Sequence, residues 1–235
     1  MSVPKELDHQ IDYWNRIGTT KAFSHPVNVG CLKQLLAPDA RILDFGCGYG
    51  RALGVLQSQG FSNLIGVDPA PAMIAAARQQ FPTIDFQELE DSPYLPLPDA
   101  SIDAALLFSV LTCVPSDDGQ LAILRETGRV LRSGGLLYIS DLWLQTDPRN
   151  VQRYQRDKTK YGLYGVFDLP EGVTVRHHDR HWIERLTQDY ELLKLDEIEV
   201  TTMNGHPARG FQWFGRKADL SAIIAKQGNV RIKPS

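Results

Sequence analysis

Cysteine is scarce in this sequence, and so is any arrangement of residues that would bind a metal. The three cysteines, Cys31, Cys47 and Cys113, contain no C-x-x-C pair, and an odd number does not suit a disulfide framework. The cluster His177–His181 lacks the H-E-x-x-H spacing of a zinc site, so we interpret it as a solvated turn leading into a helix at Trp182. We therefore expect neither disulfides nor a bound metal.

Long apolar runs and a strong excess of charge are also missing. The longest apolar run, from about Ala104 to Val114, is too short to span a bilayer, and the first residues form no apolar signal core. The net charge is −3 and the isoelectric point is near 6.1, whereas nucleic-acid-binding domains are usually basic. We expect a cytoplasmic protein that contacts neither a membrane nor nucleic acid; no feature indicates an oligomeric state.

What the sequence does contain is a regular alternation of apolar and helical segments. We expect short buried strands at residues 41–45, 63–67, 83–86, 102–108 and 135–140. Helices are expected to about Gln59, over 71–80 with Pro71 in the first turn, and from a cap at Asp117 or Asp118 to Arg132. Strands that alternate with helices predict a doubly wound α/β fold with a mostly parallel sheet.

Other segments flank this core. An apolar stripe predicts a helix over 5–17, and the aromatic and charged residues after 141 indicate an insertion. Two more strands, near 192–202 and 210–216, are joined by a turn at Asn204-Gly205, and a short helix is expected after Lys217. The predicted organisation is an N-terminal helical segment that is a candidate lid (1–38), a cofactor-binding core (39–141), an insertion or substrate cap (142–189), and a segment that completes the sheet (190–235).

The sharpest motif is the run Leu43-Asp44-Phe45-Gly46-Cys47-Gly48-Tyr49-Gly50, in which a strand enters a glycine turn that opens a helix. Such a turn brings backbone N–H groups close to a nucleotide-like ligand. The spacing is G-x-G-x-G, with Arg51 where a dinucleotide motif has its last glycine. Asp44 would repel a pyrophosphate but suits a ligand with an ammonium and a sulfonium group.

Two further acids follow later strands. Asp68 ends the strand Ile65-Gly66-Val67 and can accept both ribose hydroxyls, although it could equally be a helix cap before Pro69. Asp91 follows the third strand, where it could accept from an adenine amino group, and the backbone N–H of Ser92 could donate to the ring.

These motifs, with the run Leu95–Asp103 and the segment Glu126–Gly135, resemble the class I S-adenosylmethionine-dependent methyltransferases in order and spacing over roughly residues 40–141. The resemblance implies a Rossmann-like seven-stranded sheet whose last strand is antiparallel, with a cap between strands five and six. It implies S-adenosylmethionine as cofactor and S-adenosylhomocysteine as product. The implied cofactor residues are Asp44, Gly46, Cys47, Gly48, Gly50, Asp68, Pro69, Asp91, Ser92, Phe108 and Ser109. Where the family often has histidines after the fourth strand, this sequence has Thr112 and Cys113, which leaves the acceptor class open.

Methyl transfer from a sulfonium requires no nucleophile motif, and a base only if the acceptor keeps its proton. The candidate bases are His25, His178 and Asp141, with His206 a further candidate. The candidate acceptor residues are Tyr13, Trp14 and Phe23, which could instead be core anchors, and Arg149 and Arg153.

With Arg156 and Lys160, these two arginines would form one helical face. Such a face could hold an anionic acceptor or RNA, or could simply be solvated. The predicted function is methyl transfer to a small molecule. The alternatives are an RNA- or protein-modifying methyltransferase and a non-catalytic regulatory protein that binds the cofactor.

Overall fold

The computed structural model describes residues 3–218. The strands of the main sheet are β1 (Arg41–Phe45), β2 (Asn63–Asp68), β3 (Asp85–Glu88), β4 (Ile102–Phe108), β5 (Leu131–Leu142), β8 (Tyr190–Thr201) and β9 (Pro207–Lys217). A separate small sheet contains β6 (Val166–Asp168) and β7 (Thr174–Arg176). The helices are η1 (Lys5–Asp8), α1 (Ile11–Ile17), η2 (Gly18–Thr20), α2 (Val29–Leu35), α3 (Arg51–Ser58), α4 (Pro71–Gln80), η3 (Leu111–Cys113), α5 (Asp117–Val130), α6 (Pro148–Tyr161) and α7 (Arg180–Leu186).

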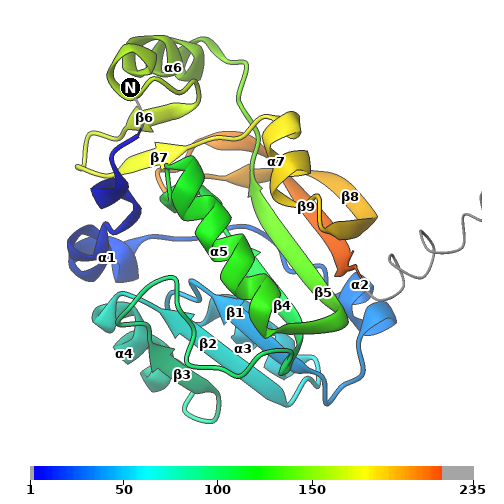
Figure 1. Ribbon diagram of the computed structural model, residues 1–235. Coiled ribbons are helices and arrows are strands. Elements are labelled where there is room, and N and C mark those ends of the chain that lie inside the picture. The colour runs from blue at the N-terminus through cyan, green and yellow to red at the C-terminus, as the bar shows by residue number, and fades with distance from the viewer. Residues whose placement is uncertain (1–2, 219–235) are drawn as a thin grey trace, which may run out of the picture.

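The main sheet has the strand order β3-β2-β1-β4-β5-β9-β8 (Figure 1). Neighbouring strands from β3 to β5 are parallel, whereas β9 is antiparallel to both β5 and β8. The predicted Rossmann-like sheet with an antiparallel last strand is confirmed. Because β1 lies between β2 and β4, the carboxyl ends of these three strands meet at one edge, where open α/β sheets bind their ligands.

Several predicted boundaries match the structure and others do not. The bounds of β1, α4 and β4 are confirmed, whereas β3 begins two residues later than expected. The helix expected over 5–17 is interrupted at Gln10, whose side chain instead donates to the carbonyl of Thr174 and accepts its N–H. The cap of α5 is the hydroxyl of Ser116, not Asp117 or Asp118, and the helix ends before Leu131 pairs with Ile102 in the sheet. The tail after Lys217 lies almost wholly outside the described residues.

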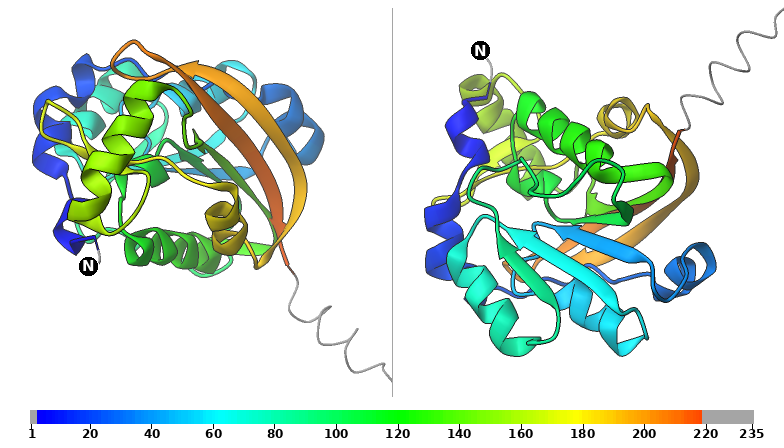
Figure 2. Two further views of the ribbon diagram at one scale, coloured as in Figure 1. Left: turned by 90° about the horizontal axis from the view of Figure 1, so that it is seen from above. Right: turned by 60° about the horizontal axis from the view of Figure 1, so that its bottom comes forward.

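Successive side chains of the central strands pack into two separate hydrophobic cores. On one face, Leu43 and Phe45 of β1 pack with residues of α5 and α7. On the other face, Ile42 packs with residues of α2, α3 and α4. The alternation follows from strand geometry, in which consecutive side chains point to opposite faces. In the right-hand view of Figure 2, the green helix α5 and the cyan helices α3 and α4 lie on opposite sides of the sheet.

A further layer covers the carboxyl ends of the parallel strands. It consists of α1, α6 and the β6–β7 sheet, which share a small core built from Tyr13, Tyr154, Phe167, Val173 and Val175. Helix α7 lies within the segment 142–189 that we expected to form a cap, but it packs against α5, and its apolar residues belong to the main core. The layer over the site is therefore the N-terminal segment together with α6, β6 and β7.

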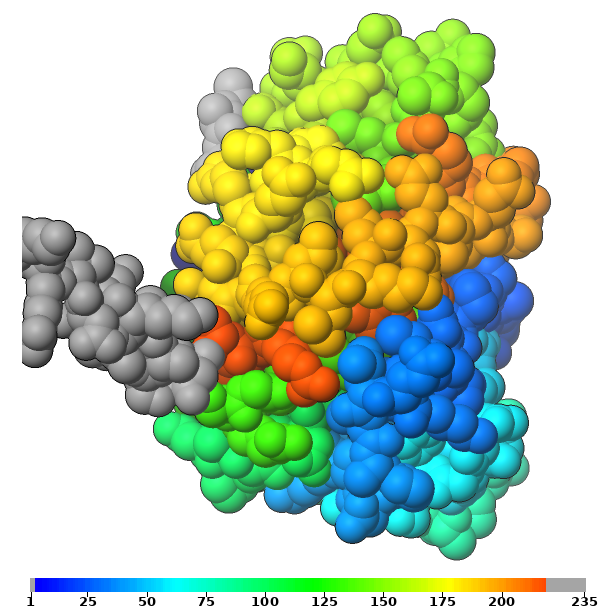
Figure 3. Space-filling model, turned by 90° about the vertical axis from the view of Figure 1, so that its right-hand side faces the viewer, coloured from blue at the N-terminus to red at the C-terminus, as the bar shows by residue number. Residues whose placement is uncertain are grey.

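The segment between η2 and α2 is anchored to the antiparallel end of the sheet. The carbonyl of Pro26 accepts from the side-chain amide of Gln212, and the N–H of Asn28 donates to the Tyr138 hydroxyl. Figure 3 views the molecule from this side, where the blue residues around α2 lie against the orange strand β8. The anchor places Phe23 and His25, which precede it, at the carboxyl edge of the sheet.

Helix α3 follows the glycine turn and packs closely against the ring of Phe81 at Gly54. A Cβ added at Gly54 would lie within 3.0 Å of three Phe81 ring atoms. We expect Gly54→Ala to lower the free energy of unfolding by about 1–3 kcal/mol, the usual cost of overpacking, although alanine is the better helix former. Gly30 is the matched control: it is an exposed helical glycine, and the one neighbour within 4 Å of an added Cβ is the Asn28 side chain at 3.9 Å.

Gly30→Ala is expected to leave that free energy unchanged or to raise it by up to about 1 kcal/mol. Urea denaturation of both variants measures the difference. Equal stability of the two variants would show that Phe81 does not constrain this helix.

Candidate cofactor and acceptor site

The glycine turn after β1 has a backbone that other residues rarely adopt. Gly46, Gly48 and Gly50 have φ angles of 71°, 55° and 82°. A Cβ at Gly46 would lie 2.7 Å from Val110, and one at Gly50 would lie 2.7 Å from Phe86. Both the left-handed conformation and the close approach therefore require glycine.

Hydrogen bonds fasten this turn to the end of β2. The backbone N–H groups of Gly46 and Cys47 both donate to the carbonyl of Val67, at 2.8 and 3.0 Å. Asp68 continues the attachment, because one carboxylate oxygen accepts the N–H of Gly48 and the other accepts that of Ala70, each at 2.9 Å. Burial raises the pKa of Asp68 to about 6, and the two backbone donors oppose the rise. Asp68 thus fastens the turn and lines the cavity, whereas the alternative that it caps the next helix is wrong, because the N-cap of α4 is Ala70, which makes no side-chain capping bond.

Asp44 is more deeply buried than Asp68 and less well paired. Among the described residues, its Oδ1 atom has no hydrogen-bond partner, although the residue lines the cavity. The pKa of Asp44 is raised to about 7, mainly by burial. Arg51 opposes the rise, and the nearby Asp68 carboxylate adds to it. A buried acceptor without a donor is costly, so this atom favours a ligand that brings a donor or a positive charge.

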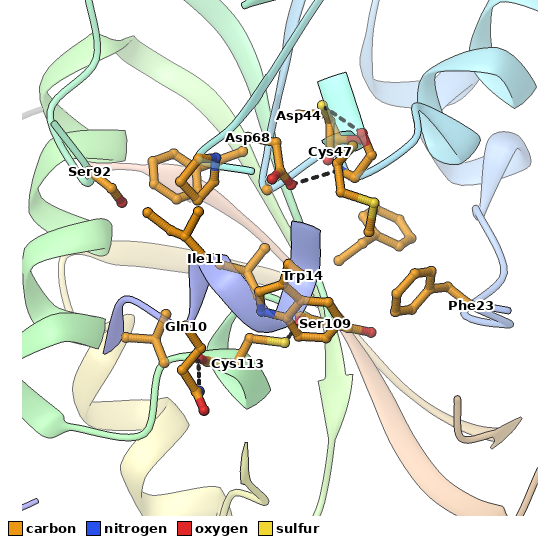
Figure 4. A pocket seen from close by; sticks show the side chains of 18 of the residues that line it. Gln10, Ile11, Trp14, Phe23, Asp44, Cys47, Asp68, Ser92, Ser109 and Cys113 are labelled. Atoms are coloured by element: carbon orange, nitrogen blue, oxygen red, sulfur yellow. Dashed lines mark hydrogen bonds between the residues drawn. The ribbon is translucent and has the colours of Figure 1, made fainter. Parts of the chain in front are cut away.

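The turn, the end of β4 and the N-terminal segment enclose one cavity (Figure 4). It has a volume of about 970 Å³ when the open space at its mouth is included. The residues proposed from the sequence that line it are Asp44, Gly46, Cys47, Gly48, Asp68, Pro69, Ser92, Phe108 and Ser109. Gly50 belongs to the turn but does not line the cavity. The exposed Asp91 does not line it either, whereas its neighbour Ser92 does.

The N-terminal segment forms the opposite wall, with Gln10, Ile11, Trp14 and Phe23 on the cavity. Phe23 lies between Trp14 and Tyr49, with ring centroids 6.2 and 5.8 Å away, so an aromatic row runs over the glycine turn. Tyr13, the other aromatic residue expected here, lines neither this cavity nor the next and is buried in the small core instead.

A second cavity, of about 770 Å³ when the open space at its mouth is included, lies between the first cavity and the α6–β7 layer. We call the two cavities the cofactor pocket and the acceptor pocket. They share Trp14, Phe23, Ser109 and Cys113 as lining residues. Ser109 has a φ of 56°, a conformation that a non-glycine residue seldom adopts and that is common at functional sites.

The four candidate bases lie in different places, and the exposed His206 lines the acceptor pocket. His25 lines the acceptor pocket, and its Nδ1 is 3.0 Å from the Ser140 hydroxyl. Burial, with a smaller effect of Arg51, lowers the pKa of His25 to about 4, so its ring is neutral at neutral pH. Asp141 and His178 line neither pocket. Asp141 is fully buried and accepts from the amide and hydroxyl of Thr112.

The expected solvated turn at 177–181 is wrong for its first two residues. His178 is buried, with Nε2 3.0 Å from the Gln120 amide nitrogen and Nδ1 3.3 Å from the carbonyl of Leu142. His177 is also buried and bonds to the Tyr154 hydroxyl. His178, which the sequence places in a charged run, is therefore a core residue. Its polar neighbours come from elements distant in the chain.

The four cations expected on one face of α6 separate into two pairs. Arg149 and Arg153 line the acceptor pocket. Arg156 pairs with Asp157 at 2.6 Å, and Lys160 pairs with Asp168 at 2.6 Å. Only the first pair is directed at the site.

Several lining residues carry no sequence signal that would have identified them. They come from distant segments and include Gln10, Met73, Phe167, Met203, Asn204 and Cys113, of which Cys113 was noted only as a departure from the family pattern. In residues 3–218, no His, Cys, Asp or Glu side chains are grouped as metal ligands, and no helix has the length and apolar character needed to cross a bilayer.

Comparison with known proteins agrees with this geometry. A family model described as a methyltransferase domain matches residues 43–139. Arsenite methyltransferase from Aquipseudomonas alcaligenes is 32% identical over 146 residues, which are 57% of this chain and 41% of that protein. For 2-methyl-6-phytyl-1,4-hydroquinone methyltransferase from Synechocystis, the figures are 31% over 119 residues, 49% and 36%. The chain thus spans about two fifths of the length of these curated relatives.

A solved structure of similar shape is a SAM-dependent methyltransferase from Methanosarcina mazei. It has a TM-score of 0.75 and 25% identity, with 80% of this chain and 97% of the other covered. Fold, glycine turn and sequence relatives agree, and this family and fold imply S-adenosylmethionine as the cofactor. Residues 43–139 thus match the methyltransferase-domain family, and the fold is that of the class I S-adenosylmethionine-dependent methyltransferases.

Proposed function

We propose that this protein transfers a methyl group from S-adenosylmethionine to a small molecule held in the acceptor pocket. The observation that carries the proposal is the junction of the two pockets, which share Trp14, Phe23, Ser109 and Cys113. A cofactor in one pocket and an acceptor in the other would meet at these four residues.

The residues of the cofactor pocket fit the cofactor. The unpaired Oδ1 of Asp44 suits an ammonium or sulfonium group, and the glycine turn leaves room for the backbone to approach the methionine portion. Asp68 has one backbone donor on each oxygen, which leaves further lone pairs for two ribose hydroxyls. Ser92, rather than the exposed Asp91, is the residue of its loop that lines the adenine side.

Methyl transfer requires the protein mainly to position the cofactor and the acceptor relative to each other. The bound cofactor supplies a methyl on a sulfonium: the sulfur–carbon bond breaks with the electron pair left on sulfur as the acceptor atom bonds to that carbon. Trp14, Phe23 and Ser109 bring the two partners together and exclude water at the junction. His25 and His206 are the base candidates that line the acceptor pocket. The neutral ring of the buried His25 can accept a proton from the acceptor, whereas His206 lies at the outer end of the pocket, which is shared with a surface groove.

Two observations favour a small acceptor over RNA or protein. Arg156 and Lys160 are engaged by Asp157 and Asp168, so α6 does not offer a face of four free cations to RNA. The acceptor pocket is a concave site with a largely apolar lining, which suits a small molecule. The names of the two relatives also describe methyl transfer to small acceptors, arsenite and a hydroquinone.

The first test joins cofactor binding to the fate of the methyl group. We expect calorimetric titration to show micromolar binding of S-adenosylmethionine and S-adenosylhomocysteine and none of NAD. With a labelled methyl donor and a cell extract, label should appear in the fraction that passes an ultrafiltration membrane. NAD binding would contradict the cofactor, label retained with RNA or protein would contradict the acceptor class, and cofactor binding without any transfer would favour the regulatory alternative.

A second test concerns the ribose contact. Asp68→Ala is expected to weaken S-adenosylmethionine binding by roughly 1.5–3 kcal/mol, the range for hydrogen bonds to a charged group. Asp39→Ala, which removes an exposed carboxylate before β1, is the control and should bind normally. An unchanged affinity in Asp68→Ala, with the fold checked by its melting temperature, would refute the role of Asp68.

A third test uses the raised pKa of Asp44, about 7 in the free protein. A cationic ligand binds the ionised carboxylate, so binding should release a proton near neutral pH, and the affinity should rise between pH 5.5 and 8 as Asp44 ionises, over roughly the interval around its pKa. Titrations in buffers of different ionisation enthalpy count the proton. Asp44→Asn should bind more weakly and lose most of the pH dependence. A variant that keeps the full pH dependence would exclude Asp44 as its source.

A further inference from the structure

Among the described residues, the acceptor pocket is lined by two positive charges and by no carboxylate. Arg149 and Arg153 line it, and none of its lining residues in the described chain is Asp or Glu. The nearest ion-pair contact of Arg149 is with Asp147 at 3.9 Å, near the limit for an ion pair, and no ion pair of Arg153 occurs within residues 3–218. Burial, together with Arg149 and Arg156, lowers the pKa of Arg153, and Asp147 opposes this without reversing it.

The buried histidines of the pocket do not add to this charge at neutral pH. Burial lowers the pKa of His25 to about 4 and that of His177 to about 3. Nδ1 of His177 is engaged by the Tyr154 hydroxyl, so its ring is a fixed neutral wall. Arg149 and Arg153 are therefore the lysine or arginine side chains that a ligand in this pocket meets, with the exposed His206 at its rim.

The remaining wall is largely apolar and comes from three separate parts of the chain. Phe167, Leu169 and Val175 come from the β6–β7 hairpin, while Trp14, Phe23 and Met203 come from the N-terminal segment and the β8–β9 turn. The Arg153 guanidinium lies 5.5 Å from the Phe167 ring centroid, a cation–π contact that holds it against the apolar wall. The pocket thus combines an apolar body with a cationic portion.

The two portions have an order along the pocket. One end shares Ser109 and Cys113 with the cofactor pocket. The other end shares Arg149, His206 and Ala208 with a surface groove that is also lined by Asp147, Glu199 and Arg209. Arg149 therefore belongs to the outer end, away from the residues at which the methyl group would be transferred.

We propose that the methyl acceptor is an amphipathic anion, whose apolar body lies against Phe167 and Trp14 and whose carboxylate or phosphate pairs with Arg149 and Arg153. The acceptor atom lies at the opposite end of the molecule, beside Ser109 and Cys113. This inference rests on the proposed function, because it takes the second cavity as the acceptor pocket.

Three probes with the same apolar body and different heads test the proposal: hydrocinnamate, hydrocinnamyl phosphate and hydrocinnamyl alcohol. Each is titrated calorimetrically into the full chain, with and without saturating S-adenosylhomocysteine. At least one of the anions should bind about tenfold or more tightly than the alcohol, as a charged hydrogen-bonded pair allows. The tighter of the two anions identifies the head group as carboxylate or phosphate.

Matched variants assign the preference to the pocket. Arg153→Gln should remove most of the difference between anion and alcohol. Arg156→Gln lies on the same helix and loses the same charge, but Arg156 pairs with Asp157 outside both pockets, so this variant should keep the difference. Melting temperatures of both variants verify that the fold is intact.

Three results would overturn the inference: equal binding of anions and alcohol, a preference that persists in Arg153→Gln, or no binding of any probe to protein that binds S-adenosylhomocysteine. Failure of S-adenosylhomocysteine itself to bind would instead overturn the proposed function. The titrations without cofactor would then still measure whether the pocket prefers an anion, so the two failures are distinguishable.

Discussion

The attachment of the glycine turn to the end of β2 is the constraint on which the rest of the site depends. Three successive N–H groups, from Gly46 to Gly48, are directed at Val67 and Asp68, and this is possible only with left-handed glycines. The attachment brings the carboxylate of Asp44 close enough to Asp68 for one to raise the pKa of the other. Two buried acids in contact with a cavity are stabilised by a positively charged ligand, so the geometry that folds the turn also selects the class of cofactor.

The cover over this site is held by contacts between residues far apart in the sequence. Gln10 joins the N-terminal segment to β7 through Thr174, and Asp8 accepts hydrogen bonds from the amide and hydroxyl of Ser116 at the start of α5. Trp14 and Phe23 are thereby held over both pockets. The N-terminal segment is thus fastened to the cap and to the core at once, and opening it would break both sets of bonds.

The sequence predicted what local physics determines. The strand Arg41–Phe45, the helix Pro71–Gln80 and the glycine turn follow from apolar runs, proline and glycine, and the structure agrees with them. The burial of His178 did not follow, because Gln120 and the carbonyl of Leu142, which surround its ring, are distant in sequence. Likewise, the spacing of the four cations on α6 shows that they share a helix, but only the positions of Phe167 and Asp168 decide which pair faces the pocket.

Buried carboxyl groups at the ends of β1, β2 and β5 connect this site with the stability of the fold. Burial raises the pKa of Asp44 to about 7 and those of Asp68 and Asp141 to about 6, from a usual value of 3.8. Between the usual and the raised values, the folded chain binds more protons than the unfolded chain, so these groups lower the free energy of unfolding as the pH rises through that interval. Near neutral pH, these groups, where they are ionised in the folded chain, therefore lower its free energy of unfolding. A cation bound beside Asp44 and Asp68 would offset part of that loss, since it stabilises their charged forms. Binding and stability are thus linked at the same two carboxylates, while Asp141, which lines neither pocket and is satisfied by Thr112, lies outside that linkage.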